Sequence, residues 1–134
     1  MKLVTRNTDY ALRAVCFIAR NQKCAVTVSE LVEKLKIPRS FLRKLLQVLS
    51  KLKVLKSSKG QGGGFLLARS PEKIFLVDLI SIFQGQVKLN ECFFKKLSCP
   101  NKKTCVLRKK IQSIEDYMVK ELNSITIASL LKGR

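Results

Sequence analysis

Two short amphipathic segments, joined by the pair Ile37-Pro38, are the strongest constraint on how this chain can fold. In residues 28–36 and again in residues 39–52, apolar side chains recur every three or four positions, which is the spacing of one face of a helix. They are Val28, Leu31, Val32 and Leu35 in the first segment and Leu42, Leu45, Leu46 and Leu49 in the second. Proline ends the first helix and suits the first turn of the next one. Two short helices around a tight break predict a helix-turn-helix.

The residues on either side of this pair favour the same fold. Thr27 and Glu30 have the spacing of a capping box, in which the threonine hydroxyl accepts a hydrogen bond from the amide of Glu30 and the Glu30 carboxylate accepts one from the amide of Thr27. After the second helix, residues 54–57 and 65–68 are short strand candidates, and the glycines of the connecting sequence KGQGGG permit a tight turn. A β-hairpin directly after a helix-turn-helix predicts a wing.

Three further segments complete a mainly helical chain. Residues 8–21 have an apolar face with little polar coverage, which predicts a buried first helix, and residues 74–83 form another apolar helix. A long helix is expected over residues 104–123, with one narrow apolar stripe that indicates a dimer seam. The stripe consists of Leu107, Ile111, Ile114, Met118 and Leu122. The predicted fold is mainly α with a small β-hairpin, a winged helix-turn-helix plus a long C-terminal dimerisation helix.

The length of 134 residues fits one ordinary domain with an appended element. We expect a winged helix-turn-helix DNA-binding domain over residues 1–85, a cysteine-bearing sensor loop over 86–104, and a dimerisation helix with a C-terminal tail over 105–134. The opening residues are too polar for a signal peptide, and the longest apolar run, residues 14–19, is too short to cross a bilayer. A cytoplasmic location with no membrane partner is therefore expected, and thiols persist or bind metal in that compartment.

The charge of the chain indicates a polyanionic partner. It has 27 basic and nine acidic residues, a net charge of +18, and no Asp or Glu between Lys34 and Arg69. Such a field attracts nucleic acid, and a helix with a cationic outer face fits the major groove of double-stranded DNA, where an arginine can bond a guanine through two donors. The candidate DNA-binding residues are Thr27, Arg39, Ser40, Phe41, Arg43, Lys44, Lys59 and Gly60.

Residues 92–105 read CFFKKLSCPNKKTC and gather three of the five cysteines in a segment without acids. The spacing does not match the C-x2-C knuckles of zinc sites, and three spread thiolates with a fourth ligand fit an iron–sulfur cluster better. The lysines favour thiolates, and Cys105 lies at a predicted helix start. Three inert thiols are the alternative on spacing alone. Cys16 is expected in the core, and Cys24 is expected to be a spectator.

Catalysis has no support in the sequence. The chain contains no histidine, and its nine acids form no paired-carboxylate or nucleophile–base pattern. We therefore expect no catalytic residues and no enzymatic activity.

Several motifs together resemble a known family. They are TDYALRA at residues 8–14, VSELVEKLKIPRSFLRKLLQVLSK at 28–51, KGQGGGFLLARSP at 59–71, and the apolar helix and cysteine segment that follow. This combination is similar to the bacterial iron–sulfur cluster regulators often called the Rrf-two family, nearly from end to end. The resemblance implies a homodimeric transcription factor, a repressor that reads a pseudo-palindromic operator and senses redox state, nitric oxide or iron–sulfur status. It also implies a two-iron or four-iron cluster held by Cys92, Cys99 and Cys105.

The resemblance extends to a fourth cluster ligand, which differs between branches of the family. IscR-like members use a histidine three residues after the last cysteine, and this chain has Arg108 there. NsrR-like members use an aspartate of the T-D-x-A-L-R motif that reaches over from the partner subunit, and Asp9 occupies that position. Asp9 is therefore the expected fourth metal ligand. Arg43 stands where IscR-like members carry an acid, and Phe41 and Phe65 replace tyrosines of relatives.

Two alternatives stay open at this point. In the first, the chain binds DNA, and the same three cysteines act as a thiol switch without a cluster. In the second, the chain is a basic RNA-associated protein. RNA recognition uses exposed aromatic side chains for stacking, and the few aromatic residues here fall on apolar faces, which disfavours this second alternative.

Overall fold

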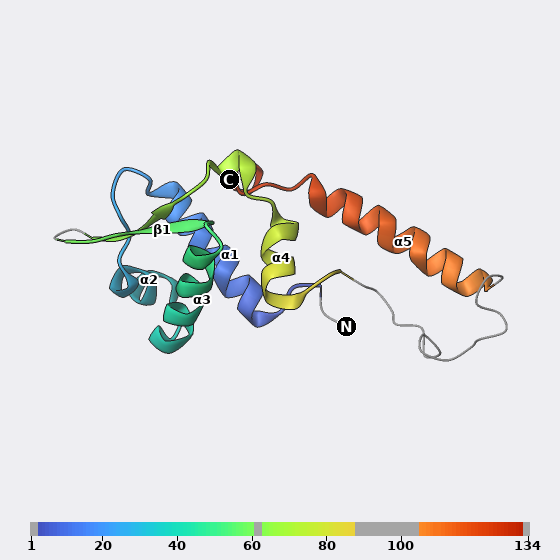
Figure 1. The fold of residues 1–134 in the computed structure, drawn as a ribbon, viewed down its shortest axis with the longest axis horizontal. Coiled ribbons are helices and arrows are strands. Elements are labelled where there is room, and N and C mark those ends of the chain that lie inside the picture. The colour runs from blue at the N-terminus through green and yellow to red at the C-terminus, as the bar shows by residue number, and fades with distance from the viewer. Residues whose placement is uncertain (1–2, 61–62, 88–104, 133–134) are drawn as a thin grey trace.

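The computed structural model describes residues 3–60, 63–87 and 105–132 of the 134-residue chain, and within these ranges it is mainly α-helical (Figure 1). In chain order the elements are α1 (Arg6–Arg20), α2 (Val28–Leu35), α3 (Arg39–Lys51), β1 (Leu55–Ser58), β2 (Gly64–Leu67), the short 3-10 helix η1 (Pro71–Lys73), α4 (Leu76–Gln84), α5 (Val106–Asn123) and α6 (Ile127–Lys132). The helices and strands expected from the sequence are all present, with ends that differ by one or two residues. The sequence pattern predicted neither η1 nor α6.

Helix α1 is the central element of the winged domain. It contacts α3, α4, α6 and β2, and its inward face carries small or branched side chains that are fully buried, among them Ala11, Ala14 and Val15. Small side chains let neighbouring backbones approach closely. Burial of this helix on most sides confirms the expectation drawn from its apolar face.

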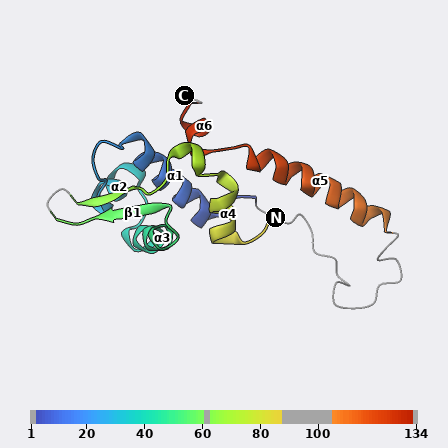
Figure 2. The ribbon, with the colours of Figure 1, turned by 45° about the horizontal axis from the view of Figure 1, so that its top comes forward.

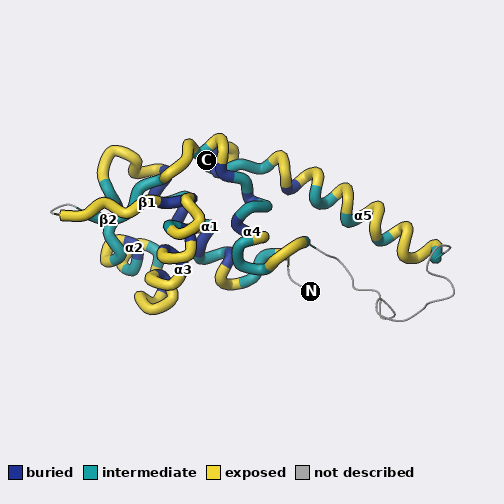
Figure 3. The backbone as a smooth tube through the Cα atoms, in the orientation of Figure 1, coloured by how far each residue is buried: buried dark blue, intermediate teal, exposed yellow. Residues whose placement is uncertain are grey.

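The core lies where α1, α2, α3 and the hairpin meet, and it extends to α4 and α6. The largest fully buried side chains are Ile18, Leu31, Ile37, Leu42, Leu46, Leu49, Leu55, Ile74, Leu79, Ile80 and Ile127. Figure 3 shows this buried backbone around α1 and α4, whereas most of α5 is exposed or half-buried. Each such side chain stabilises the fold by roughly 1.5–3 kcal/mol relative to an exposed position.

Strands β1 and β2 form a two-stranded antiparallel hairpin. Leu55 pairs with Leu67 at its base, and Ser58 pairs with Gly64 near its tip. Figures 1 and 2 show the hairpin projecting from the domain beside α2 and α3. The predicted wing is therefore present, shifted by one residue in each strand.

Helix α5 leaves the domain, and α6 returns to it. In Figures 1 and 2, α5 extends away from the winged domain on the side opposite the hairpin. Its last turn packs on α4 through Leu122, which meets Leu76 and Ile80. Helix α6 then inserts the fully buried Ile127, whose amide donates to the carbonyl of Ile74 at 2.9 Å. The part of the chain expected to be a tail thus contributes to the core.

The observed arrangement confirms the expected fold class, a winged helix-turn-helix followed by a long C-terminal helix. None of the helices in the described ranges is both long and apolar enough to cross a membrane.

Candidate nucleic-acid interface and cysteine site

The turn between α2 and α3 fixes how α3 is presented to solvent. Lys36 ends α2 with a left-handed backbone (φ 58°), and its amide donates to the carbonyl of Val32 at 3.0 Å. Ile37 is 2% exposed and anchors the turn in the core. Pro38 is the N-cap residue of α3, one position before the first turn in which the sequence placed it. The break is therefore rigid, because one side chain is buried and one backbone angle is fixed by proline.

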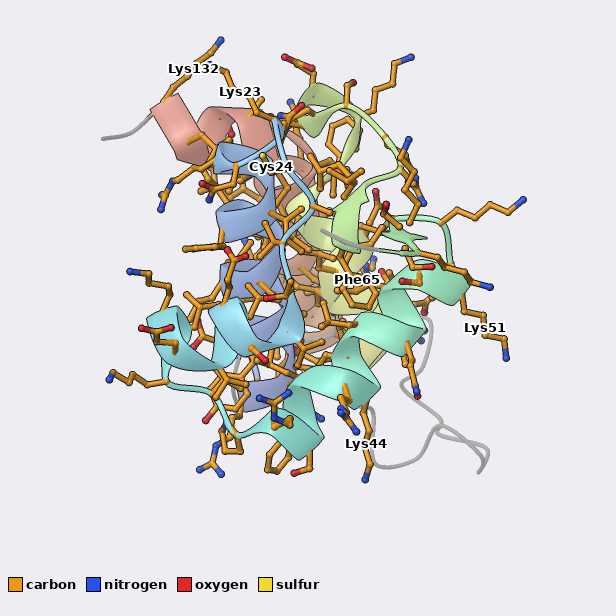
Figure 4. All side chains as sticks on the ribbon, turned by 90° about the vertical axis from the view of Figure 1, so that its left-hand side faces the viewer. Lys23, Cys24, Lys44, Lys51, Phe65 and Lys132 are labelled. Carbon is orange, nitrogen blue, oxygen red and sulfur yellow. The ribbon has the colours of Figure 1, made fainter. Side chains whose placement is uncertain are left out.

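The outer face of α3 is cationic and the inner face is apolar. Leu42, Leu45, Leu46 and Leu49 are buried, whereas Arg39, Ser40, Arg43, Lys44 and Gln47 are exposed. In Figure 4 the side chain of Lys44 points from α3 into solvent, and Lys51 does so near the end of the same helix. The predicted division of the two faces is confirmed, and the predicted DNA-contacting side chains of α3 share its exposed face.

Two side chains at the start of α3 are tied to other helices. The Nη2 of Arg39 donates to Ser29 Oγ on α2 at 3.2 Å. The ring of Phe41 is 42% exposed and meets Tyr10 on α1 edge-to-face, with 6.2 Å between the ring centroids. The first turn of α3 is thus positioned by α1 and α2 together, while Arg43 remains exposed on the next turn.

The N-terminus of α2 lies against the wing. The amide of Glu30 donates to Thr27 Oγ1 at 3.1 Å, which is one of the two capping-box bonds expected from the sequence. The expected return bond from the Thr27 amide to the Glu30 carboxylate is not formed between these two described residues. Val26 and Phe65 exchange two backbone hydrogen bonds of 3.0 and 2.8 Å, so β2 is joined to the chain just before α2. A side chain at Gly64 would meet the Val26 carbonyl oxygen at 2.4 Å, so this approach requires glycine. Half-buried Thr27 therefore lies beside the start of β2, at the end of the hairpin nearer its tip.

The tip of the wing carries the remaining predicted DNA contacts. Lys59 follows β1 and is exposed, and Gly60 has a φ of 95°, which favours glycine. Residues 34–69 contain no acidic side chain, so α3 and the wing present cations without local carboxylate partners in sequence. A surface of this kind suits the phosphates of nucleic acid.

Of the three clustered cysteines, the structure describes Cys105, while Cys92 and Cys99 lie outside the described residues. Cys105 is the N-cap residue of α5, and its Sγ accepts a hydrogen bond from the amide of Arg108 at 3.4 Å. Cys16 is half-buried against the core, as expected, and Cys24 is exposed in the first loop.

Asp9 lies in the first turn of α1, where its Oδ2 forms an ion pair with Arg13 Nε at 3.0 Å. The aspartate side chain is 42% exposed and lines an open depression with Thr5, Arg6 and Tyr10. Figure 1 places the start of α5, and hence Cys105, far from α1 of the same chain. Within the described ranges, no three Cys, Asp or Glu side chains converge to hold a metal. A single chain therefore does not bring Asp9 and Cys105 together.

Gln84, at the end of α4, is a positioning residue that the sequence pattern did not indicate. Its Oε1 accepts hydrogen bonds from the Thr5 amide at 2.8 Å and from Thr8 Oγ1 at 2.6 Å, and its Nε2 donates to the Leu3 carbonyl at 3.1 Å. Thr8 is fully buried. These bonds fix the start of α1, and so Asp9, against the point where the chain departs for the cysteine segment.

The apolar stripe of α5 is largely uncovered. Leu107 is 67% exposed and Ile114 is 59% exposed, whereas Leu122 is buried against α4. Ile111 and Met118 are half-buried. The predicted stripe is present, and its first half has no cover within the described chain.

Comparisons with known proteins cover nearly the whole chain. The model of the family Rrf2, described as an iron-dependent transcriptional regulator, matches residues 4–133. A protein of Aquifex aeolicus assigned as an HTH-type transcriptional regulator is 34% identical over 91% of this chain and 86% of its own length. The HTH-type transcriptional regulator NsrR of Bacillus licheniformis is 28% identical over 100% of this chain and 94% of its own length.

Two solved structures have the same fold. CymR, the global cysteine regulator of B. subtilis, superposes with a TM-score of 0.85 at 18% identity and covers 100% of this chain and 99% of its own. T. potens IscR superposes with a TM-score of 0.71 at 29% identity, covering 99% of this chain and 88% of its own.

Proposed function

The chain belongs to the Rrf2 family of transcriptional regulators and is not an enzyme, and from this premise we propose that it is a cytoplasmic, homodimeric repressor that binds double-stranded DNA. The chain would then be divided into a winged DNA-binding domain, a cysteine-bearing sensor loop and a dimerisation helix. Its operator would be pseudo-palindromic, because a two-fold symmetric dimer reads two related half-sites.

The cationic surface of α3 and the wing is the observation that best supports DNA binding. Arg43 and Lys44 are exposed on the helix that follows the turn, Lys59 is exposed at the wing, and no acid occurs between residues 34 and 69. In this arrangement α3 enters the major groove and Arg43 bonds a base edge. Lys59 contacts phosphate or the minor groove. Phe41 meets Tyr10 edge to face and is exposed, so its ring is also available for a contact with DNA.

Two substitutions test these roles on a duplex operator. Arg43→Ala should relax sequence discrimination by roughly 1–3 kcal/mol, because a bidentate base contact is lost. Lys59→Gln should weaken binding to all duplexes about equally, because a phosphate contact carries no sequence information. Binding curves on operator, scrambled duplex and RNA measure both effects. Equal binding of the wild type to every duplex and to RNA would contradict the proposal.

The uncovered stripe of α5 supports the homodimer. Leu107 and Ile114 are large apolar side chains that remain mostly exposed in one chain. A long helix with one apolar stripe is typical of a seam between two helices. The second copy of α5 is the partner that fits, since both copies carry the same stripe.

We further propose that Cys92, Cys99 and Cys105, together with Asp9 of the partner subunit, hold an iron–sulfur cluster. The surroundings of Cys105 suit such a group, because its sulfur lies at a helix N-terminus, accepts an amide hydrogen bond and has basic neighbours. Asp9 is half-exposed and lies at the edge of an open depression, so its carboxylate is accessible from outside its own chain. When bound, the cluster would supply redox and nitric-oxide reactivity.

Protein prepared without oxygen separates the cluster from a thiol switch. If the three cysteines hold a cluster, the protein should be coloured and contain iron. If they act as a thiol switch without a cluster, the protein should be colourless and free of iron. Asp9→Ala should make the cluster less stable, and Arg13→Ala is the matched control because it removes the ion pair and keeps the carboxylate. A cluster that is equally stable in Asp9→Ala and in the wild type would exclude Asp9 as a ligand.

A further inference from the structure

A basic depression lies at the base of the wing, outside the DNA contacts named above. It is an open hollow of about 510 Å³ between the end of α3, β1 and the end of β2. Its polar lining includes Ser50, Lys53, Lys56, Ser57 and Arg69. We call it the wing-base pocket.

The charge of the wing-base pocket is uniformly positive. Lys53, Lys56 and Arg69 supply three cations, and all three residues are exposed. No acidic residue lines the hollow, and the acids nearest in sequence are Glu33 and Glu72. Three cations held close together repel one another, so an anion between them would be stabilised by all three.

Arg69 is held in place by the end of α3. Its Nε donates to the carbonyl of Lys53 and its Nη2 to the carbonyl of Leu52, each at 3.2 Å. These carbonyls lie at and beyond the C-terminus of the helix, where such groups have no intrahelical partner. A guanidinium has five N–H donors in a fixed plane, so donors that these two carbonyls do not use remain for a ligand. Arg69 is therefore a pre-positioned donor group.

The side chains that line the pocket favour an oxygen-rich ligand. Ser57 also lines the hollow and is exposed, so its hydroxyl is accessible to a ligand there. A hydroxyl, a fixed guanidinium and two ammonium groups form a donor set that suits the several oxygens of a phosphate.

We propose that the wing-base pocket binds a phosphate group, and that in the working protein this is a backbone phosphate of duplex DNA. The pocket shares two elements with the proposed interface, because α3 also carries Arg43 and β1 leads directly to Lys59. Occupation of the pocket extends the footprint on DNA beyond the groove-facing end of α3. This source of the phosphate rests on the proposed DNA-binding function, whereas the phosphate chemistry of the pocket does not.

The salt dependence of DNA binding tests the site. Lys56→Gln removes one cation from the pocket, and Lys132→Gln on α6 removes one at the other end of the winged domain (Figure 4). The plot of log binding constant against log salt concentration should become shallower by about 0.9 in Lys56→Gln, because one phosphate contact is lost. Sequence preference should stay unchanged, and Lys132→Gln should keep the wild-type slope. Matched thermal unfolding curves establish that both variants are folded.

Titration of the DNA-free protein with inorganic phosphate separates the possible sources. Wild-type protein should bind phosphate and Lys56→Gln should bind it less, as measured by calorimetry. Lys56→Gln could lose phosphate binding and still show the same salt dependence of DNA binding as the wild type. The pocket would then bind a free phosphate compound and not a DNA phosphate. Equal slopes together with equal phosphate titrations would overturn the whole proposal. If the wild type binds no duplex at any salt concentration, the proposed function fails and the phosphate titration alone decides the pocket.

Discussion

Helices α3 and α5 are both amphipathic, but they differ in where their apolar faces go. In α3, Leu42, Leu46 and Leu49 are fully buried against the rest of the winged domain. In α5, Leu107 is 67% exposed and Ile114 is 59% exposed, and Leu122 alone among the residues of this helix is buried. Within the described residues, one chain therefore covers the apolar face of α3 and leaves most of the apolar face of α5 exposed.

This difference separates two parts of the function. The surface that would meet DNA is built by one chain, because α3 is fixed by its core face, by the turn at Ile37-Pro38 and by contacts to α1 and α2. The surface around α5 and Cys105 is the proposed dimer seam, because exposed apolar area of this kind marks an interaction site. Under this proposal, sensing would require two subunits to associate. The conformation of α3 would not, because the fold of one chain fixes it.

The largest effect is expected from a change in α3. Leu46→Ala leaves a cavity in the core and should lower the free energy of unfolding by about 2–5 kcal/mol. Urea unfolding of the wild type and the variant measures this loss. Leu107→Ala is the matched control on α5, and its effect should vanish at protein concentrations low enough to dissociate the dimer. If both variants lost the same free energy of unfolding at that dilution, the proposed difference between α3 and α5 would be wrong.

A charge on the uncovered stripe should act on assembly and leave the fold intact. Ile114→Lys places an ammonium group in the proposed seam, and we expect the dimer dissociation constant to rise about a hundredfold or more. Sedimentation equilibrium measures this change, and circular dichroism should report the same helix content. Ser113→Lys adds the same charge beside the stripe and should leave association nearly unchanged. If Ile114→Lys associates like the wild type, the stripe is not the seam.

Gln84 connects the two regions, so its loss should have an intermediate effect. Gln84→Ala removes the acceptor that the Thr5 amide and the buried Thr8 hydroxyl share, although the hydroxyl keeps its contact with Thr5 Oγ1, and should cost about 1–3 kcal/mol of stability. The opening should be local, with faster hydrogen exchange at the amides of Thr5 and its neighbours and little change in α3. Gln84→Glu keeps the acceptor oxygen and should retain more of the protection. Uniform deprotection of α1 and α3 would instead mean that Gln84 supports the whole domain.

The smallest expected effect concerns the cap of α2. Thr27→Ala removes the acceptor of the Glu30 amide and should cost about 1 kcal/mol. Thr27→Ser keeps the acceptor and should cost much less. Thermal unfolding of the three proteins measures the difference. A Thr27→Ala variant as stable as the wild type would show that the α2 N-terminus is held by the wing contact and not by its cap.

Local patterns in the sequence predicted the helix-turn-helix well and the long-range contacts poorly. The leucine spacing of α3 and the Thr27 cap are fixed by neighbours in the chain, so they could be read directly and are confirmed. The bonds of Gln84 join residues 76 to 81 positions apart, and no local pattern reports such a contact. The sequence pattern did not predict helix α6, because this helix has only six residues and is stabilised by the tertiary burial of Ile127.

In the candidate site, too, features set by local sequence could be predicted and contacts between distant residues could not. The cationic face of α3 follows from helical periodicity, and the structure has it where the sequence predicted it. The spacing of Cys92, Cys99 and Cys105 suggested a cluster, and the family resemblance supported it and added Asp9 as a ligand. These ligand roles remain predictions. A site shared by two chains cannot be derived from the periodicity of one, because the contacts that form it lie between copies.

Selection of bound duplexes from a random pool tests the central claim most directly. Two copies of α3, joined through α5, should select a pseudo-palindrome whose half-sites lie about 10 base pairs apart or at a multiple of that spacing. The Ile114→Lys variant should lose the requirement for the second half-site and bind more weakly. A selected sequence without two-fold symmetry, or a pool that is not enriched at all, would contradict the account of a dimer that reads DNA through two α3 helices.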